Sequence, residues 1–265
     1  MKQRCWDDEI CSSVATSLLA SANENQATKA RLLACRGMGS GSWLHALPSA
    51  NLGLRLSNDE TRIAVGLRLG APLVLEHACV CGVKVHSDGH HGLACRKSSG
   101  RHLRHSLAND VIFRALRSAN TPSILEPTGM LRADGKRPDG VTMIPWSRGK
   151  ALVWDFTCPD TLAPSHVRQT SVAAGSAAIA AESKKRTKYA ELSVSNSFVP
   201  FAIETLGVWG TDAYALSSEI GSRIAAVTGE PRSTAFFRQR LDISVQRGNA
   251  AAILGTLPST ASTYC

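Results

Sequence analysis

The sequence has no long hydrophobic run. None of its 265 residues belongs to an uncharged apolar stretch near the roughly 18–20 residues that a membrane-spanning helix requires. Residues 1–9 turn acidic where a secretory signal peptide would turn apolar. We therefore expect neither membrane insertion nor secretion, and we expect an intracellular protein.

Repeats and strong charge bias are also absent. Charged residues make up only 19% of the chain and hydrophobic residues 43%, which excludes both a coiled coil and a disordered polymer. A chain of this length forms one or two domains with a sizeable core.

The charge that is present favours one sign. Thirty Lys and Arg oppose twenty-one Asp and Glu, for a formal charge of +9. Residues 96–140 alone contain nine basic and four acidic residues. Such a segment suits contact with a phosphate backbone, although charge runs are usually solvated helix faces. The candidate nucleic-acid-binding residues are Arg96, Lys97, Arg101, Arg104, His105 and Arg137.

The helix expected from residue 105 up to Pro122 decides how three of these residues lie. Arg101 and Arg104 are predicted to precede that helix, where its amide dipoles favour anions. His105 falls on the apolar face and is predicted to point inward. Asp110 falls on the opposite face and is not a catalytic candidate.

Three of the eight cysteines cluster in the middle of the chain. In a chain that looks intracellular, such a cluster indicates thiols or metal ligands rather than a disulfide framework. Cys79 and Cys81 form one pair, and His91 and Cys95, three residues apart, form a second. Two turn-like segments with soft ligands predict a closed, tetrahedral structural zinc site.

Alternatives to this ligand set remain open. His90 competes with His91, and His77 and His86 are spare donors. The spacing of the first pair is one residue rather than the usual two to four, so the site is not a standard zinc finger. Reduced thiols packed as small hydrophobic side chains are the simpler alternative, but three Cys and two His within 17 residues favour a metal site.

Hydrophobic periodicity predicts the remaining elements. Ser57 and Glu60 form a capping box for a helix that ends at Gly70. Further helices are expected at about 165–190, 212–228 and 233–250, and strands at 123–126, 140–144, 150–157 and 198–206. This order predicts an α/β fold in which a small mixed sheet is flanked by helices, preceded by an N-terminal helical segment.

Two carboxylates are candidates for metal-assisted chemistry. Asp139 lies in a turn that enters a strand, and Asp155 lies within the strand at 150–157. A hairpin between them would bring both to one end of the sheet. Two close carboxylates repel unless a cation joins them, and hard oxygen ligands select Mg²⁺ or Mn²⁺. Asp139 alone is an ordinary turn residue, but the apolar neighbours of Asp155 imply that it is buried and needs a partner.

A cationic group is expected beside these carboxylates. Lys185, Lys188 and Tyr189 share a helical face with Ala178 and Ala181. Because this small-residue face must pack on the sheet, the two lysines and the tyrosine are predicted to point toward the carboxylates.

Together these motifs resemble a known family. Cys79-x-Cys81, His91-x₃-Cys95, Arg104-His105, Glu126-Pro127, Arg137-Pro138-Asp139, Asp155 and Lys185-x₂-Lys188-Tyr189 follow one another as in the C-terminal region of non-LTR retrotransposon polyproteins. The resemblance spans roughly residues 43–250. That region carries a CCHC zinc knuckle and a restriction-like endonuclease of the PD-(D/E)XK type.

The resemblance implies a function. It implies an Mg²⁺- or Mn²⁺-dependent endonuclease that nicks target DNA, with Asp139 and Asp155 as metal ligands and Glu126 as a further candidate. In the family pattern a lysine follows the second carboxylate by two residues, and here Thr157 occupies that position. The resemblance suggests that Lys185 or Lys188 takes over that role. It also implies a nuclear location, DNA and the RNA of the element as partners, and no small-molecule cofactor.

The sequence also predicts domain boundaries and an alternative function. We predict a helical segment at 1–70, a zinc-knuckle module at 71–104, a nuclease domain at 105–250 and a tail at 251–265. The only Asp-Asp pair, Asp7-Asp8, does not close a buried hairpin, so a reverse-transcriptase palm would have to lie elsewhere in a parent polyprotein. The alternative function is a zinc-dependent nucleic-acid-binding module with an inactive nuclease core.

Overall fold

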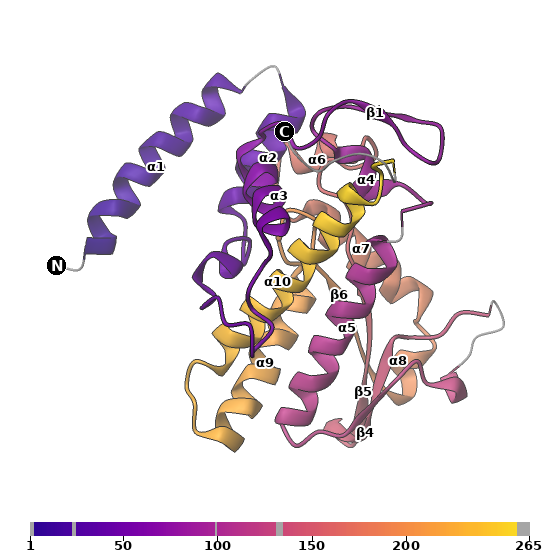
Figure 1. The fold of residues 1–265 in the computed structure, drawn as a ribbon. Coiled ribbons are helices and arrows are strands. Elements are labelled where there is room, and N and C mark those ends of the chain that lie inside the picture. Colours follow the sequence, from indigo (N-terminus) through magenta and orange to yellow (C-terminus); the bar gives the residue numbers. More distant parts are fainter. Residues whose placement is uncertain (1–2, 23–24, 99, 131–134, 259–265) are drawn as a thin grey trace.

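A four-stranded mixed sheet forms the centre of the molecule. The computed structural model describes residues 3–22, 25–98, 100–130 and 135–258. The strands lie in the order β3-β4-β5-β6 (Figure 1). They cover Ser123–Leu125, Gly140–Ser147, Lys150–Thr157 and Ser197–Ala202. The predicted α/β class with a mixed sheet is therefore confirmed.

The β4–β5 hairpin sets the register on which the site depends. Its tight turn is formed by Arg148 and Gly149, both with positive φ, as two-residue hairpin turns require. Gly140 pairs with Trp154, so the preceding Asp139 lies beside the end of β5. Strand β6 runs parallel to β5, and α7 lies in the crossover between them.

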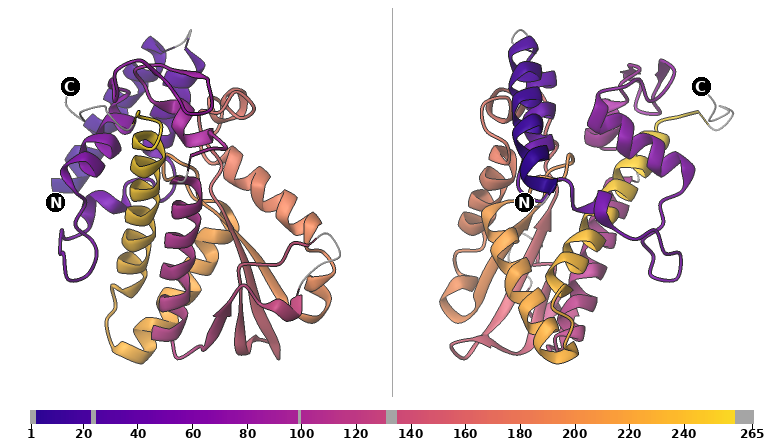
Figure 2. Two further views of the ribbon diagram at one scale, coloured as in Figure 1. Left: turned by 45° about the vertical axis from the view of Figure 1, so that its right-hand side comes forward. Right: turned by 90° about the vertical axis from the view of Figure 1, so that its left-hand side faces the viewer.

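Helices cover both faces of the sheet, as the two views in Figure 2 show. Leu152, Trp154 and Phe156 of β5 share a buried cluster with α5, α9 and α10 on one face. Asp155 points to the other face, toward α7. The helices that form these layers are α5 (Gly100–Ser118), α7 (Ser176–Lys188), α9 (Thr211–Thr228) and α10 (Ser233–Leu254).

The rest of the described chain is mostly helical. The predicted capping box of Ser57 and Glu60 is present, and its helix ends at Gly70 in the left-handed conformation. The remaining elements are α1 (Gln3–Ser21), α2 (Gln26–Arg36), η1 (Ser42–His45), α3 (Asn58–Leu69), β1 (His77–Ala78), β2 (Lys84–Val85), α4 (His90–Ala94), η2 (Thr128–Met130), α6 (Val167–Thr170) and α8 (Leu192–Ser195).

Three predicted boundaries are wrong. Helix α5 begins at Gly100 rather than 105, so Arg101 and Arg104 lie within it. The helix predicted over 165–190 is broken at Gly175, whose φ is 83°. A new helix starts there because the Glu204 carboxylate accepts the backbone N–H groups of Ala177 and Ala178. The strand predicted over 198–206 ends at Ala202.

Helix α10 connects the sheet domain to the zinc-ligand segment. Its buried Ile253 packs in one cluster with Cys79, Cys95 and helices α2 and α3. A Cβ on Gly92 would approach the carbonyl oxygen of Ala252 to 2.7 Å, which shows how closely α4 and α10 pack. The predicted tail at 251–265 thus begins inside α10, and residues 259–265 lie outside the described residues.

A close contact between α5 and α10 gives a test of this packing. A Cβ on Gly248 of α10 would lie 2.6 Å from the Cα of Arg104 in α5. Gly248→Ala should therefore lower the free energy of unfolding by about 1–3 kcal/mol, as overpacked cores do. Urea unfolding followed by circular dichroism measures this, with Gly129→Ala as control because nothing lies within 4 Å of its Cβ. Equal stabilities of the two variants would contradict the close packing.

A buried carboxylate in α10 predicts a pH dependence. Asp242 Oδ1 accepts a hydrogen bond from Trp209 Nε1 at 2.9 Å, and Oδ2 has no donor. Burial raises the pKa of Asp242 from 3.8 to about 8. The folded state therefore retains a proton that the unfolded state releases, and stability declines as the pH rises from about 4 to 8. Asp242→Asn should be more stable than wild type at pH 8, with a much smaller difference at pH 4. The measurement is urea unfolding at both pH values, and a constant difference would contradict it.

Candidate functional site

The predicted zinc ligands meet in one cluster. The ligand atoms of Cys79, Cys81, His91 and Cys95 all lie within 4.8 Å of one another. The two sulfurs of Cys79 and Cys95 are 3.8 Å apart, and Cys81 Sγ lies 3.2 Å from His91 Nε2. Tetrahedral zinc with bonds of about 2.3 Å to sulfur requires edges near 3.7 Å. This cluster can bind a metal ion such as zinc.

The competing histidines have other partners. His90 lies 3.4 Å from a carboxylate oxygen of Asp88, and His86 lies 3.2 Å from Glu76. His77 contacts the carbonyl of Leu75 and the hydroxyl of Thr256. Among the four candidates, His91 is the one that joins the three cysteines.

A tight turn arranges the first cysteine pair. The N–H of Gly82 donates to the carbonyl of Cys79, and Gly82 has a φ of 89° in open space. A backbone hydrogen bond from Val83 lowers the pKa of the Cys81 thiol, which favours the thiolate that metals bind. Burial raises the pKa of Cys79. A bound cation would offset that burial cost.

The two predicted carboxylates lie at one end of the β4–β5 hairpin, where the charge of Asp139 acts on Asp155. The backbone N–H of Asp139 donates to the carbonyl of Trp154. The side-chain Oδ2 of Asp139 accepts the N–H of Phe156 at 2.5 Å. Asp139 therefore forms hydrogen bonds with the backbone of Trp154 and Phe156, the two residues that flank Asp155.

The carboxylate of Asp155 is buried, with a residue exposure of 3%. Its Oδ1 accepts from the Tyr189 hydroxyl at 3.0 Å, and that single phenolic proton is shared with the carbonyl of Arg137. Its Oδ2 forms an ion pair with Lys185 but has no hydrogen bond of suitable geometry. Lys185 and Tyr189 thus point toward Asp155, as the helical face predicts.

Burial and neighbouring charges act in opposite directions on the pKa of Asp155. Burial is the largest cause that raises the pKa of Asp155, and the neighbouring charge of Asp139 raises it further. Lys185 and Tyr189 lower the same pKa. An additional positive charge near the two carboxylates would relieve their repulsion.

Two other predicted residues lie at the edge of this group. Lys188 Nζ donates to the Tyr189 hydroxyl at 2.7 Å, and that hydroxyl donates to Asp155. Glu126 is exposed and forms an ion pair with Arg137. Among the residues that the structure describes, the cysteine–histidine cluster is the one set of three or more potential metal ligands. Glu126 therefore does not complete a three-carboxylate group.

His105 is less buried than the sequence predicts, and Asn109 was not singled out from the sequence. The His105 side chain is 47% exposed, and its Nε2 lies 3.1 Å from Asp139 Oδ2. Its Nδ1 lies 3.3 Å from the amide nitrogen of Asn109, whose Oδ1 accepts from Trp154 Nε1 at 3.0 Å. The hydrogen bond to Asp139 raises the pKa of His105. Asn109 is one turn after His105 on α5, which was the available signal.

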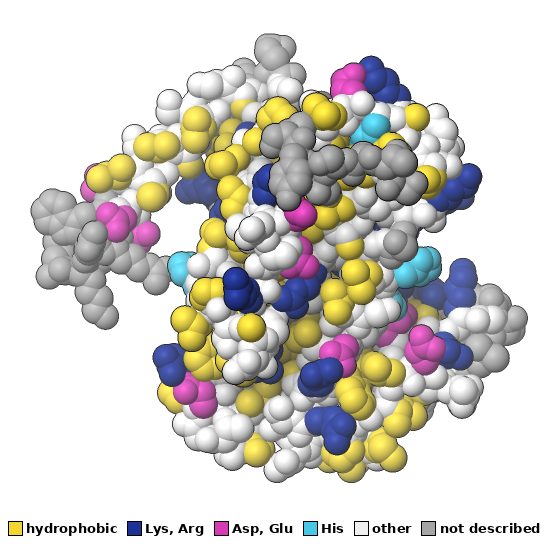
Figure 3. All heavy atoms as spheres, viewed as in Figure 1, with side chains coloured by type: hydrophobic (Ala, Val, Ile, Leu, Met, Phe, Trp, Pro, Cys, Tyr) yellow, Lys and Arg dark blue, Asp and Glu magenta, His cyan; other side chains and the backbone are white. Residues whose placement is uncertain are grey.

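A basic cavity of about 390 Å³ opens beside His105. Figure 3 shows His and Lys or Arg side chains gathered next to the N-terminal end of α5. The cavity is lined by residues that include Arg96, Arg101, His102, Lys185, Phe156 and Thr157. Lys97 is exposed on the segment that leads into α5.

Arg104 also lines this cavity, but most of its side chain is enclosed. Its residue exposure is 3%, and its guanidinium donates to Asn249 Oδ1 at 2.7 Å and to the carbonyl of Leu93. Because α5 starts earlier than predicted, Arg104 faces α10. It connects the two helices by hydrogen bonds and forms part of the cavity wall.

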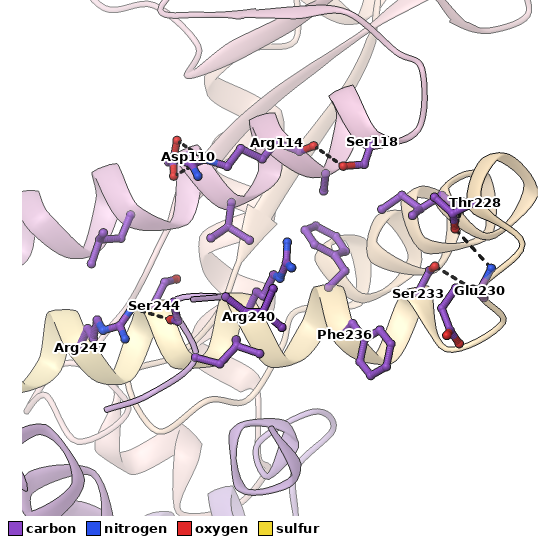
Figure 4. Close-up of a pocket in the computed structure, with 18 residues that line it drawn as sticks. Asp110, Arg114, Ser118, Thr228, Glu230, Ser233, Phe236, Arg240, Ser244 and Arg247 are labelled. Carbon is purple, nitrogen blue, oxygen red and sulfur yellow. Dashed lines mark hydrogen bonds and ion pairs between the residues drawn. The ribbon is translucent and has the colours of Figure 1, made fainter. Parts of the chain in front are cut away.

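A second cavity offers different chemistry. It measures about 430 Å³ and lies between α5, α9 and α10, with Phe236 and Arg240 on its wall (Figure 4). Its two acids are already paired, Asp110 with Arg114 and Glu230 with Arg232. This mostly apolar cavity therefore lacks the close carboxylate pair found at the end of the β4–β5 hairpin.

Comparison with known proteins adds no assignment. No protein-family model matches the chain, and no curated protein is significantly similar to it. Within the described part of the chain, every helix is too short or too polar to span a bilayer.

The metal cluster predicts a loss on substitution. Cys95→Ser should remove most bound zinc and lower the melting temperature, because Cys95 lies within the cluster that packs on α10. Zinc content by elemental analysis and thermal unfolding with and without a chelator measure both effects. Cys11→Ser, at an exposed cysteine, is the control. A chelator that leaves the melting temperature of the wild type unchanged would contradict a structural metal.

Proposed function

We propose that this protein is an Mg²⁺-dependent DNA endonuclease that cuts one strand by means of a metal-activated water. The observation that carries the proposal is the group formed by Asp139, Asp155 and Lys185 at the end of the β4–β5 hairpin. Two carboxylates, one buried, together with a lysine are the groups that metal-assisted phosphodiester hydrolysis uses.

The donor atoms fit a small divalent cation. Asp155 Oδ2 is buried and forms an ion pair with the ammonium group of Lys185, so a positive charge already occupies this position. Within the described residues, Asp139 Oδ1 has no donor, since the side-chain contacts of Asp139 fall on Oδ2. These hard oxygens suit Mg²⁺ or Mn²⁺. Such an ion would polarise the phosphodiester and lower the pKa of the attacking water.

The residues of the chain supply the remaining steps. Without a divalent cation, Lys185 neutralises Asp155. A cation bound by the two carboxylates would take over that task and leave Lys185 to steady the negative charge on the phosphate. Tyr189 holds the Asp155 carboxylate through Oδ1, with Lys188 behind it. Lys185 thus takes the role that Thr157 cannot fill.

The basic cavity supports binding of a polyanion. Arg96, Arg101 and His102 line it together with Lys185, so a phosphate backbone lying there would pass the carboxylates. Cys95 of the metal cluster directly precedes Arg96 and Lys97, so zinc bound there would restrain the segment that leads into α5. Arg137 forms an ion pair with Glu126 and precedes Asp139 by two residues.

The order of motifs adds a more specific proposal. It favours a CCHC zinc knuckle followed by a restriction-like PD-(D/E)XK core of retrotransposon origin. The parent polyprotein would then supply the reverse transcriptase, the partners would be target DNA and the RNA of the element, and the site of action would be the nucleus.

One observation favours a second candidate function. Thr157 stands where the family pattern has its lysine, and Lys185 is bound to Asp155. A core fixed in this state would bind nucleic acid through the zinc cluster and the basic cavity without cutting it.

Plasmid nicking by the purified, zinc-loaded protein separates the two functions. Nicking in Mg²⁺ or Mn²⁺ and its loss in EDTA are expected. Asp139→Ala and Asp155→Asn should each lower the rate by more than about 100-fold, because each removes a ligand of the cation. Asp110→Asn, at a surface carboxylate paired with Arg114, should leave the rate unchanged.

DNA affinity measured against salt completes the test. Under the endonuclease proposal the two active-site variants bind DNA as tightly as wild type, and binding weakens steeply with salt. A folded, zinc-loaded protein that binds DNA but never nicks it would establish the second candidate. Absence of salt-sensitive binding would contradict both.

A further inference from the structure

A buried tryptophan fixes the orientation of an amide close to the carboxylates. Trp154 is fully buried in the central strand, and its indole N–H can only donate. It donates to the side chain of Asn109 at 3.0 Å, so the acceptor there must be the amide oxygen. The amide NH₂ group of Asn109 therefore faces away from Trp154, toward His105.

The orientation of the amide decides where His105 carries its proton. The NH₂ group of Asn109 lies 3.3 Å from His105 Nδ1 and can only donate to it. Nδ1 must then be the unprotonated nitrogen, and the ring proton resides on Nε2. That nitrogen lies 3.1 Å from Asp139 Oδ2 and donates to it.

The result is a carboxylate with two unlike oxygens. Oδ2 of Asp139 accepts the N–H of Phe156 and forms an ion pair with His105 Nε2 at 3.1 Å, whereas no donor among the described residues engages Oδ1. The His105 ring also packs edge-on against the Phe156 ring, with centroids 5.9 Å apart. The Phe156 N–H thus belongs to strand β5, and the His105 ring packs against that strand.

We propose that Trp154, Asn109 and His105 form a hydrogen-bonded chain that holds Asp139 by Oδ2 and presents Oδ1 to a divalent cation. His105 is in this view a positioning residue that acts through Asp139. The inference rests on the proposed function for the cation, but the hydrogen-bonded chain itself does not. Partners that orient a metal ligand typically contribute 10–100-fold to metal affinity or activity.

The first test reads the tautomer of His105 without any catalytic metal. Long-range ¹H–¹⁵N correlation spectra of the zinc-loaded wild type near pH 8, with the signal assigned by loss in His105→Gln, should show a neutral ring protonated at Nε2. Asn109→Asp places an acceptor opposite Nδ1 and should move a proton onto that nitrogen. A wild-type ring with a proton on Nδ1 would overturn the inference.

The second test measures binding of Mn²⁺ alone by calorimetry, with zinc already loaded and Asp139→Ala as the reference for heat from other sites. His105→Met has no donor and should weaken Mn²⁺ binding about tenfold. His105→Gln can donate through its amide and should retain most of the affinity. His45→Met, at an exposed histidine on η1, should match wild type.

The outcomes separate the inference from the proposed function. Equal Mn²⁺ affinity of wild type and His105→Met would overturn the inference while leaving the endonuclease intact. Mn²⁺ heats that are the same in wild type and Asp139→Ala would instead overturn the proposed cation site. The tautomer measurement then decides the hydrogen-bonded chain by itself.

Discussion

The close packing of α5 against α10 is the constraint on which the rest of the structure depends. The two backbones approach so nearly that Gly248 has no room for a side chain beside Arg104. Arg104 is enclosed there and bonds Asn249, whose own amide donates to the carbonyl of Thr205 beyond β6. This buried network joins α5, α10 and the sheet. It thereby fixes the angle at which α5 presents His105 and Arg101 to the end of β5.

Buried acids play a structural part as well as a chemical one. Glu204 caps the start of α7, and Glu182 of α7 in turn accepts the N–H groups of Asp212 and Ala213 at the start of α9. Burial raises the pKa of both acids, while the helix N-termini favour their charged forms. The carboxylates thus connect β6, α7 and α9 in sequence. Lys185 lies on α7, so the caps that fix α7 also hold Lys185 beside Asp155.

Local patterns in the sequence were enough to predict much of this arrangement. Strand β5 is apolar on both faces, which identifies a central strand, and the capping box at Ser57 was readable because capping depends on adjacent residues. The cysteine–histidine set and the inward face of Lys185 followed from spacing alone.

What the sequence could not supply was tertiary context. The break at Gly175 depends on Glu204, a residue far along the chain, and the burial of Arg104 depends on a glycine in α10. Periodicity placed His105 on the apolar face of its helix. In the structure His105 lies beside Asp139 at the end of the β4–β5 hairpin, where its side chain is 47% exposed. The role of Asn109 could not be predicted, because an asparagine within a helix can have many roles. Its partner Trp154 comes from another element.

The docking of α4 on α10 also sets an order in time. Gly92 and Ala252 pack together, yet the ribosome delivers the second long after the first, on the order of ten to thirty seconds at ordinary rates of synthesis. During that interval the thiols of Cys79, Cys81 and Cys95 lack the cover of α10, although α2 and α3 are already synthesised. A nascent chain that captured its ion early would keep these sulfurs out of disulfide exchange until α10 arrived. A bound ion would then protect the thiols from oxidation during synthesis and, later, stabilise the packing of the folded protein.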